Sequence, residues 1–253
     1  MFEKSLISWI RKQQTPSSRT VYKIAKSLLL FQSPFIPLLH IPLYRFHLFV
    51  RGFILGGLSR LYWTPVFRAR LQGTHRKLRL AGVGFPMVTG PVELTVGDNC
   101  RLSSAITVSG RTSSLTPPTL QLGNNVGIGW QSTIAVGSTI VLKDNVRIGG
   151  GAFLAGYPGH PLDASDRAAG LADRDEQVGD IILEQDVWLG TRVMVMAGVS
   201  IGAGTIVASG SVVTKSLPSC VIAAGVPAQI VRKLPSSVDP LRDDNIRQFG
   251  GQS

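Results

Sequence analysis

The chain has 253 residues, enough for one domain with an appendage, and its 44% of hydrophobic residues exclude a disordered protein. Its two cysteines and four histidines argue against a disulfide-stabilised fold and a His-rich metal site. No apolar segment ends in a small-residue cleavage site, so we expect a cytoplasmic protein. The net charge of +11 could indicate a nucleic-acid partner, so the distribution of the charge along the chain is considered next.

Residues 1–80 are predicted to form a basic, apolar extension. They contain 14 Lys and Arg and one acid, Glu3, whereas residues 81–253 contain 12 basic and 14 acidic residues. The positive charge therefore belongs to the extension, and the main domain is nearly neutral. Because no nucleic-acid-binding motif accompanies this charge, we do not expect a nucleic-acid partner.

The extension alternates apolar runs with basic residues. Three prolines between residues 34 and 42 are expected to break any helix there, and no run of 18 uninterrupted apolar residues exists, so a spanning helix is not predicted. Arg45, Arg51 and Arg60 among Phe, Leu and Ile residues are more typical of helices that lie on a membrane surface. The alternative is that these apolar residues cover one end of the main domain or join subunits.

A six-residue period begins near Val96 and predicts the architecture of the main domain, residues 81–234. Aliphatic residues recur every six positions, and the position four residues further on is small or β-branched. Each unit is one short strand and one turn, and three units make one coil of a triangular β-helix whose aliphatic residues point to the axis. Cys100 falls at an inward small position and is interpreted as a structural thiol. The clearest aliphatic series is Leu183, Leu189, Val195, Ile201, Val207 and Val213.

The spacing of the repeat also predicts where loops emerge. Coils begin at residues 96, 122, 142, 183 and 201, and every step but the last exceeds the bare length of 18, by 8, 2 and 23 residues. The insertions follow Val108, Ile134 and Leu154, each in the third unit of its coil, so they are expected at one corner of the prism. Loops gathered on one edge of a rigid scaffold predict a binding site. The longest, roughly residues 155–182, contains His160.

These features resemble the hexapeptide-repeat acyltransferases. The likeness rests on the repeat, on GHPLDASDR and DVWLGTRV, and on the ending IGAGTIVASGSVVTKSLPSCVIAAGVPAQIVRKL. It covers about residues 90–234 and is closest to maltose and galactoside O-acetyltransferases and to acetyltransferases of bacterial capsule and exopolysaccharide assembly, including the colanic-acid type. It implies a left-handed parallel β-helix, a homotrimer, and acetyl-CoA bound between adjacent subunits. We expect Gly225 and Pro227 to form the last turn before a short C-terminal helix, with residues 235–253 as a tail.

His160 is the candidate general base. Moving an acetyl group from a thioester to a sugar hydroxyl requires removal of a tightly held proton, and a neutral imidazole can accept it during the attack. His160 is the last of the four histidines in the chain and the only one in the repeat region, and it matches the base of the family's GHP segment. No Ser or Cys is visibly paired with a base as a nucleophile, so direct transfer is expected. The alternative for His160 is a surface histidine in a mobile loop.

Other residues are assigned to the site by resemblance. In galactoside acetyltransferases an Asn on an earlier coil lies close to the base, but this chain has no Asn at the equivalent place, and Gln131, Ser132 or Asp163 is the candidate for orienting His160. The residues expected to wall the acceptor pocket are Trp130, Tyr157 and Trp188. For the two tryptophans, packing against the β-helix is the alternative role.

A binding edge for acetyl-CoA requires small side chains and free backbone amides, and resemblance places positive charge near the CoA phosphates. For the two basic candidates, Lys215 and Arg232, the alternative is an ordinary solvated surface charge. No metal is expected, because a γ-type carbonic anhydrase requires three histidines across coil interfaces and the repeat contains only one histidine. The predicted acetyl-CoA contacts are Gly190, Ala208, Ser209, Gly210, Lys215 and Arg232.

The sequence therefore predicts an acetyl-CoA-dependent O-acetyltransferase that acts on a small or lipid-linked sugar in exopolysaccharide, capsule or lipopolysaccharide assembly. Residues 1–80 are expected to hold it peripherally on the cytoplasmic face of the inner membrane. Two alternatives stay open: an acetyltransferase of an antibiotic, an amino acid or a sugar amine, and a non-catalytic β-helix scaffold.

Overall fold

In the computed structural model, which describes residues 2–12 and 14–235, the chain divides into two compact units between Gly52 and Phe53. Residues 53–80, grouped above with the extension, lie in the same unit as the β-helix. The physical reason is that Phe67 is part of the β-helix core and Gln72 forms a parallel bridge with Thr95.

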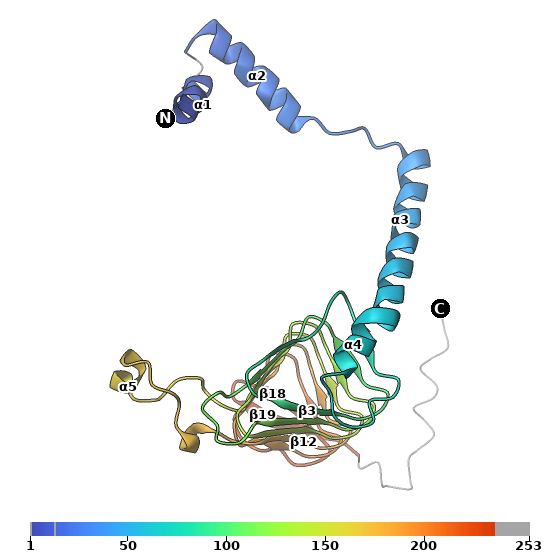
Figure 1. Ribbon diagram of the computed structural model, residues 1–253, viewed down its shortest axis with the longest axis vertical. Coiled ribbons are helices and arrows are strands. Elements are labelled where there is room, and N and C mark those ends of the chain that lie inside the picture. The colour runs from blue at the N-terminus through green and yellow to red at the C-terminus, as the bar shows by residue number, and fades with distance from the viewer. Residues whose placement is uncertain (1, 13, 236–253) are drawn as a thin grey trace. The chain divides into compact units, whose positions relative to one another are not determined.

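The first unit is helical. Helices α1 (Phe2–Lys12) and α2 (Pro16–Leu30) contact each other, and a longer helix, α3 (Pro37–Leu58), begins after a short linker (Figure 1). A capping box begins α2: the Ser18 N–H donates to the Thr15 hydroxyl at 3.2 Å, and the Thr15 N–H donates to the Ser18 hydroxyl at 3.0 Å.

Helix α3 contains two of the three prolines that were expected to break it, whereas Pro34 lies in the non-helical linker before it. Pro37 is its first residue, where a missing N–H costs no hydrogen bond, and Pro42 lies early in the helix and removes one. The helix continues through a π-helical turn, η1 (Ser59–Trp63), into α4 (Thr64–Arg68). The resulting 32 residues, Pro37–Arg68, are long and apolar enough to cross a membrane by length and composition alone.

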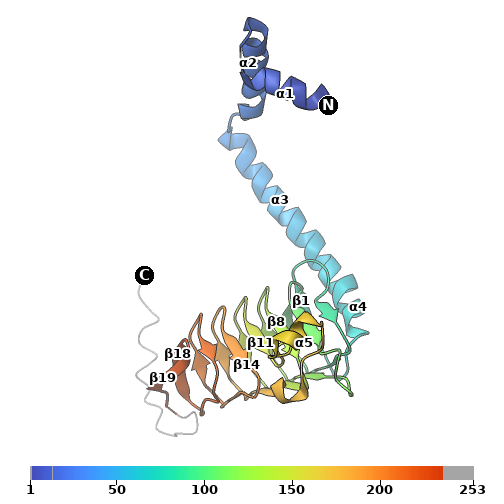
Figure 2. The ribbon, with the colours of Figure 1, turned by 90° about the vertical axis from the view of Figure 1, so that its left-hand side faces the viewer.

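The second unit is a parallel β-helix with three sheets, and Figure 2 shows its coils stacked from β1 at one end to β18 and β19 at the other. This is the predicted fold, consistent with a left-handed β-helix. The first sheet contains β1 (Arg79–Ala81), β4 (Arg101–Ser103), β7 (Gly127–Ile128), β10 (Arg147–Ile148), β13 (Trp188–Leu189), β16 (Ile206–Val207), β18 (Val221–Gly225) and β19 (Ala228–Lys233). The second contains β2 (Met87–Thr89), β5 (Thr107–Gly110), β8 (Thr133–Val136), β11 (Phe153–Ala155), β14 (Met194–Met196) and β17 (Val212–Val213). The third contains β3 (Glu93–Val96), β6 (Thr119–Leu122), β9 (Thr139–Leu142), β12 (Ile181–Leu183) and β15 (Ser200–Ile201).

The strand register confirms the predicted coil starts. Val96 pairs with Leu122, Leu122 with Leu142, Leu142 with Leu183, and Leu183 with Ile201. These are the five positions that the six-residue period gave. Strands β1 and β2 add coil structure ahead of Val96, where the sequence period is too weak to detect.

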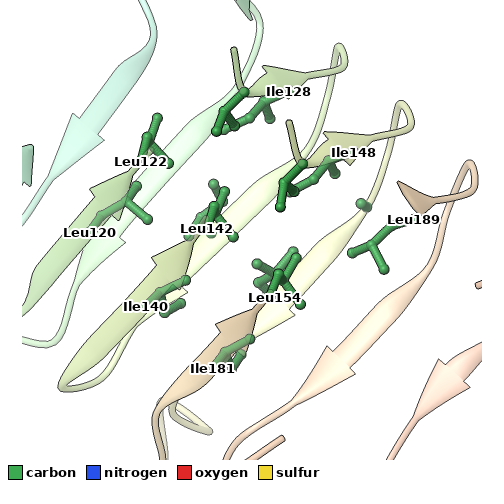
Figure 3. Close-up of a cluster of buried hydrophobic side chains, with 14 of the residues drawn as sticks. Leu120, Leu122, Ile128, Ile140, Leu142, Ile148, Leu154, Ile181 and Leu189 are labelled. Carbon is green, nitrogen blue, oxygen red and sulfur yellow. The ribbon is translucent and has the colours of Figure 1, made fainter. Parts of the chain in front are cut away.

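Inward-pointing aliphatic side chains form the core, as the repeat predicts. The six residues of the clearest series, Leu183 to Val213, are all at most 1% exposed. Figure 3 shows the same stacking in earlier coils, where Leu122, Leu142 and Ile148 point into the interior with their neighbours. Because each layer rests on the next, burial of these residues couples the coils into one body.

Turn residues at the corner between the third and first sheets adopt left-handed backbone conformations. Asn99, Asn125, Asn145 and Asp186 occupy equivalent positions there with φ values of 56–63°. The Asn125 side-chain amide donates to Asn145 at 2.8 Å, and that of Asn145 donates to Asp186 at 2.9 Å. Short polar side chains are favoured at such turns because they tolerate this conformation and can bond to each other along the stack.

Other parts of the chain contact both outer strands of the parallel part of the first sheet, β1 and β18. At the first end the Ser59 hydroxyl donates to the Leu80 carbonyl at 2.6 Å, and the Leu80 N–H donates to the Thr64 hydroxyl at 3.3 Å. At the other end β19 pairs antiparallel with β18. The segment directly after Pro227 is therefore a strand and not the short helix expected there, because its backbone hydrogen-bonds to the last edge of the first sheet. The predicted tail lies mostly outside the described residues.

The two thiols differ in exposure, which gives a first prediction. Cys100 is fully buried, its thiol donates to the Gly123 carbonyl at 3.2 Å, and burial raises its pKa, whereas Cys220 is half-buried. We expect a thiol reagent such as DTNB to modify one cysteine of the folded chain and both after denaturation. Cys220→Ser should abolish the native reaction, and rapid modification of Cys100 in that variant would contradict its assignment as a structural thiol.

Candidate active site

Three loops meet at one corner of the β-helix, as the spacing of the insertions predicts. Residues 111–118, 137–138 and 156–180 all connect a strand of the second sheet to a strand of the third. The longest loop carries a short helix, α5 (Ala164–Ala168), and a 3-10 turn, η2 (Asp175–Gln177), and it projects beyond the coils (Figure 1).

A buried ion pair joins the first of these loops to the longest. Arg111 and Asp173 are 5% and 7% exposed, and the Arg111 Nε donates to Asp173 Oδ1 at 2.8 Å. A second guanidinium nitrogen donates to the Asp173 backbone carbonyl at 2.8 Å, and the third donates to Asp175 at 2.6 Å. Burial alone would lower the pKa of Arg111, but the hydrogen bonds to both aspartates raise it above its ordinary value. Each guanidinium nitrogen of Arg111 thus donates a hydrogen bond that ties the two loops together.

The Arg111–Asp173 pair is also connected to the segment that carries the predicted base, His160. The second Asp173 oxygen accepts the backbone N–H of Gly159 at 3.3 Å, directly before His160. On the other side, the Gln177 side-chain amide donates to the His160 carbonyl at 3.5 Å. The backbone of His160 is therefore tethered, while its imidazole is exposed to solvent. A tethered, accessible imidazole is suited to meet a substrate hydroxyl.

The three candidates for orienting His160 lie in different settings. The Ser165 hydroxyl and the N–H groups of Asp166 and Ser165 donate to Asp163, which caps α5, and these bonds lower the pKa of its carboxyl. Ser132 is 1% exposed and its hydroxyl donates to the Gly149 carbonyl at 3.2 Å inside the β-helix. Gln131 is an exposed turn residue with φ of 54°. Within residues 14–235, none of these side chains hydrogen-bonds to the His160 ring.

A second edge carries the small residues predicted to contact acetyl-CoA. Gly190, Ala208, Ser209 and Gly210 lie at the corner between the first and second sheets, at the ends of β13 and β16. The coils approach closely there: a Cβ added at Gly190 would lie 2.6 Å from the Ser209 backbone nitrogen. The same corner carries Trp130, Gln131 and Ser132. Gly190 is therefore buried between coils, whereas Ser209 and Gly210 are exposed at this corner beside the exposed side chains of Trp130 and Gln131.

The glycines of this edge allow a prediction about stability. A Cβ at Gly149 would lie 2.6 Å from the backbone nitrogen of Thr191 in the next coil. Gly149→Ala is expected to lower the free energy of unfolding by about 1–3 kcal/mol, measured by urea denaturation. The control is Gly57→Ala in α3, where nothing lies within 4 Å of the added Cβ and the helix should gain about 1 kcal/mol. Equal stability of both variants would refute the close approach of the coils.

The single chain does not bring all the predicted site residues together. Trp130 is at the edge of small residues, Tyr157 is at the loop corner with its hydroxyl 3.4 Å from Ser109, and Trp188 faces outward from the first sheet. Lys215 is exposed in the turn after β17, on the loop corner, and Arg232 is exposed on β19 beside Ile222. The predicted pocket and acetyl-CoA contacts are thus divided between two corners and a face of the prism.

A cleft of about 410 Å³, lined by both polar and apolar residues, opens at the loop corner. Arg111 and Asp175 reach it from the ion network, so it adjoins the anchor of the His160 segment. Among residues 2–12 and 14–235, no group of three or more His, Cys, Asp or Glu side chains is arranged to hold a metal ion. The hydroxyl-bearing residues that line the cleft are Ser114, Thr116, Thr119, Ser138 and Thr139.

Sequence reasoning did not identify Arg111 and Asp173. They are 62 positions apart, and no repeat or spacing connects residues in two different insertions. The only available signal was that both lie in loops expected at the same corner.

Comparisons with known proteins agree with the repeat. The family described as bacterial transferase hexapeptide (six repeats) matches residues 180–215. A galactoside O-acetyltransferase from Escherichia coli is 32% identical over 115 residues, which are 46% of this chain and 54% of that protein. A putative acetyltransferase from Saccharomyces cerevisiae is 34% identical over 117 residues, 46% of this chain and 56% of that protein. The chain therefore spans about half the length of these relatives.

A solved structure has the same fold. The N-acyltransferase AntD from Bacillus cereus, in complex with dTDP and 3-hydroxybutyryl-CoA, covers 74% of this chain and 96% of its own with a TM-score of 0.54 and 14% identity. At this identity the likeness concerns the fold alone. Residues 180–215 thus carry the bacterial transferase hexapeptide repeat, and the β-helix to which they belong resembles the hexapeptide-repeat acyltransferases that its sequence motifs indicate.

Proposed function

We propose that this chain transfers an acetyl group from acetyl-CoA to a hydroxyl of a sugar, with His160 as general base. The observation that carries the proposal is the exposed imidazole of His160 on a segment tethered by Asp173 and Gln177 at the corner where the loops gather. The similarity to a galactoside O-acetyltransferase supports the reaction class, and the hydroxyl-lined cleft at the same corner supports a sugar acceptor.

In this proposal His160 moves one proton twice. Its neutral imidazole accepts the proton of the acceptor hydroxyl as that oxygen attacks the thioester carbonyl, which gives a tetrahedral intermediate. When the intermediate collapses, the C–S bond breaks, and the imidazolium returns the proton to the departing thiolate. The products are the acetyl ester and CoA, and no covalent enzyme intermediate forms.

We further propose that the working site is shared between subunits of a homotrimer. In one subunit the His160 loop and the edge of Gly190 and Ser209 lie at different corners. A neighbouring copy would bring its own edge against the loop corner, so acetyl-CoA would lie between two chains. Lys215, already on the loop corner, would then supply positive charge on the same side as His160.

The acceptor that we propose is a sugar of an exopolysaccharide, capsule or lipopolysaccharide precursor, either free or linked to lipid. The test is thiol release from acetyl-CoA by the purified chain with a panel of acceptors: simple galactosides and glucosides, lipid-linked oligosaccharides, amino sugars, amino acids and antibiotics. Release that depends on a hydroxyl sugar is expected, and light scattering should give the mass of three chains.

Two results would overturn the proposal. Release only with amine acceptors would identify an N-acetyltransferase on the same scaffold. No release with any acceptor, together with no binding of acetyl-CoA by calorimetry, would identify a non-catalytic β-helix.

A further inference from the structure

The helical unit carries an extensive apolar surface that nothing in the described structure covers. Between Leu28 and Leu58 no large apolar side chain is buried, and Leu29 and Leu38 are 84% and 89% exposed. Soluble monomers rarely expose continuous apolar areas larger than a few hundred Å². These side chains are therefore expected to meet an apolar partner.

The charge of the same region indicates the chemistry of that partner. Residues 1–52, which form the helical unit, contain eight Lys and Arg and one acid, Glu3. A second copy of this chain would bring the same positive charge to the contact, with a single carboxylate in the unit to balance it. An anionic partner that is also apolar satisfies both requirements, and a bilayer with acidic phospholipids has this combination.

Helices α1 and α2 are arranged to combine the two properties. They enclose an apolar groove of about 420 Å³, lined by Ile7, Ile10 and Leu29, and the basic residues Arg11 and Lys26 border it. The Lys26 ammonium lies 6.0 Å from the centroid of the Tyr22 ring. Long basic side chains beside an apolar surface can reach phosphate headgroups while their alkyl stems stay in the apolar layer.

Helix α3 carries one stripe of polar residues on an otherwise apolar surface. His40, Tyr44, His47 and Arg51 recur at intervals of four, three and four residues, which places them in one stripe along the helix. The residues around this stripe are mostly Leu, Ile and Phe. Arg45 and Arg51 lie in the middle of α3, and each charged side chain at the centre of a bilayer costs about 2.5–3.5 kcal/mol. An orientation in the plane of the interface avoids this cost.

We propose that α1, α2 and α3 dock this protein on the surface of an anionic phospholipid bilayer, with the apolar side chains of α2 and α3 inserted and Arg11, Lys23 and Lys26 at the headgroups. This inference is independent of the acetyl-transfer reaction, because it rests on the helical unit alone. For an enzyme that modifies lipid-linked sugars, such docking would place it where those acceptors are exposed.

The test uses the full-length chain in vesicle flotation without acetyl-CoA or acceptor. We expect binding to vesicles with roughly one third phosphatidylglycerol, weaker binding to phosphatidylcholine alone, and release by high salt. Lys23→Glu/Lys26→Glu should weaken binding to anionic vesicles by roughly tenfold or more. The matched control is Arg101→Glu/Arg192→Glu, which reverses two exposed charges on the β-helix and should bind as the parent does.

A second variant tests the apolar part. Leu29→Ser/Leu38→Ser alters two highly exposed side chains, so folding should be unaffected by circular dichroism, yet binding to anionic vesicles should fall. Equal binding of the charge-reversed chain and its control would overturn the proposal. The proposal would also be overturned if the chain bound neither kind of vesicle and instead buried α3 in contacts between copies. Retention in the bilayer after alkaline carbonate extraction would show that α3 spans the membrane and would overturn surface docking.

Discussion

His160→Ala is expected to lower kcat for acetyl transfer by about 10²–10⁴, with little change in the affinity for acetyl-CoA. The reason is that the variant loses the group that accepts the hydroxyl proton, while the edge proposed to bind acetyl-CoA is untouched. Steady-state thiol release with the best acceptor of the panel, and calorimetric titration of acetyl-CoA, measure the two quantities separately. Added imidazole should restore part of the rate, because a small base can enter the space left by the side chain.

A histidine elsewhere in the same unit provides the control. His75 accepts a hydrogen bond from Arg68 Nε at 2.9 Å, outside the loop corner, and His75→Ala should keep the parental turnover. If His160→Ala retains the rate within a factor of two, the imidazole is not the base. The proposal would then require another residue of the loop corner.

Arg111→Met is expected to release the His160 loop from the β-helix. The change leaves Asp173 buried without its partner, and breaking a buried ion pair in this way costs about 3–5 kcal/mol. Because the loop can detach while the coils stay folded, we expect this cost to appear first as local opening. Limited proteolysis should cut within residues 156–180 much faster than in the parent, and kcat should fall because Gly159 loses its anchor.

Two further variants distinguish loss of the buried pair from loss of a charge. Arg174→Met removes a basic residue of the same loop, but its contacts with Asp166 and Glu176 are solvent-exposed, so the protease resistance and turnover of this variant should stay close to those of the parent. Arg111→Met/Asp173→Leu removes both partners and should recover part of the protease resistance, because no charge is left buried. Parental proteolysis and turnover in Arg111→Met would contradict the anchoring role.

The β-helix was the most predictable part of the molecule. Burial of one aliphatic residue in every six follows directly from the geometry of the coil, so the series from Leu183 to Val213 fixed the register and the coil starts. The corner from which the loops emerge was predictable for the same reason. Strand β19 was not, because the pairing of the segment after Pro227 depends on the open edge of β18 and not on its own residues.

The candidate site was predictable only in part. The repeat gave the loop that carries His160, but the structure places Trp130, Gln131 and Ser132 at a different corner, away from the expected contact with His160. Contacts between loops could not be derived, because the pairing of Arg111 with Asp173 depends on how two insertions fold against each other. The six-residue repeat predicts how the coils of one chain stack on each other. It does not predict contacts between two chains, so it cannot identify the residues of a site that is shared between subunits.

The contacts at the two ends of the first sheet affect how the protein can associate end to end. A stack of parallel coils ends in rows of unpaired N–H and C=O groups, and such edges can add further strands without limit, as in fibrils. Here the Ser59 and Thr64 side chains hydrogen-bond both polar groups of Leu80 in β1, and β19 pairs antiparallel with β18 at the other end of the first sheet. The contacts with Leu80 lower the tendency of that edge to accept a further strand. At the other end, a second copy would meet an antiparallel strand and not the edge of a parallel coil, which disfavours continued stacking of coils in the first sheet.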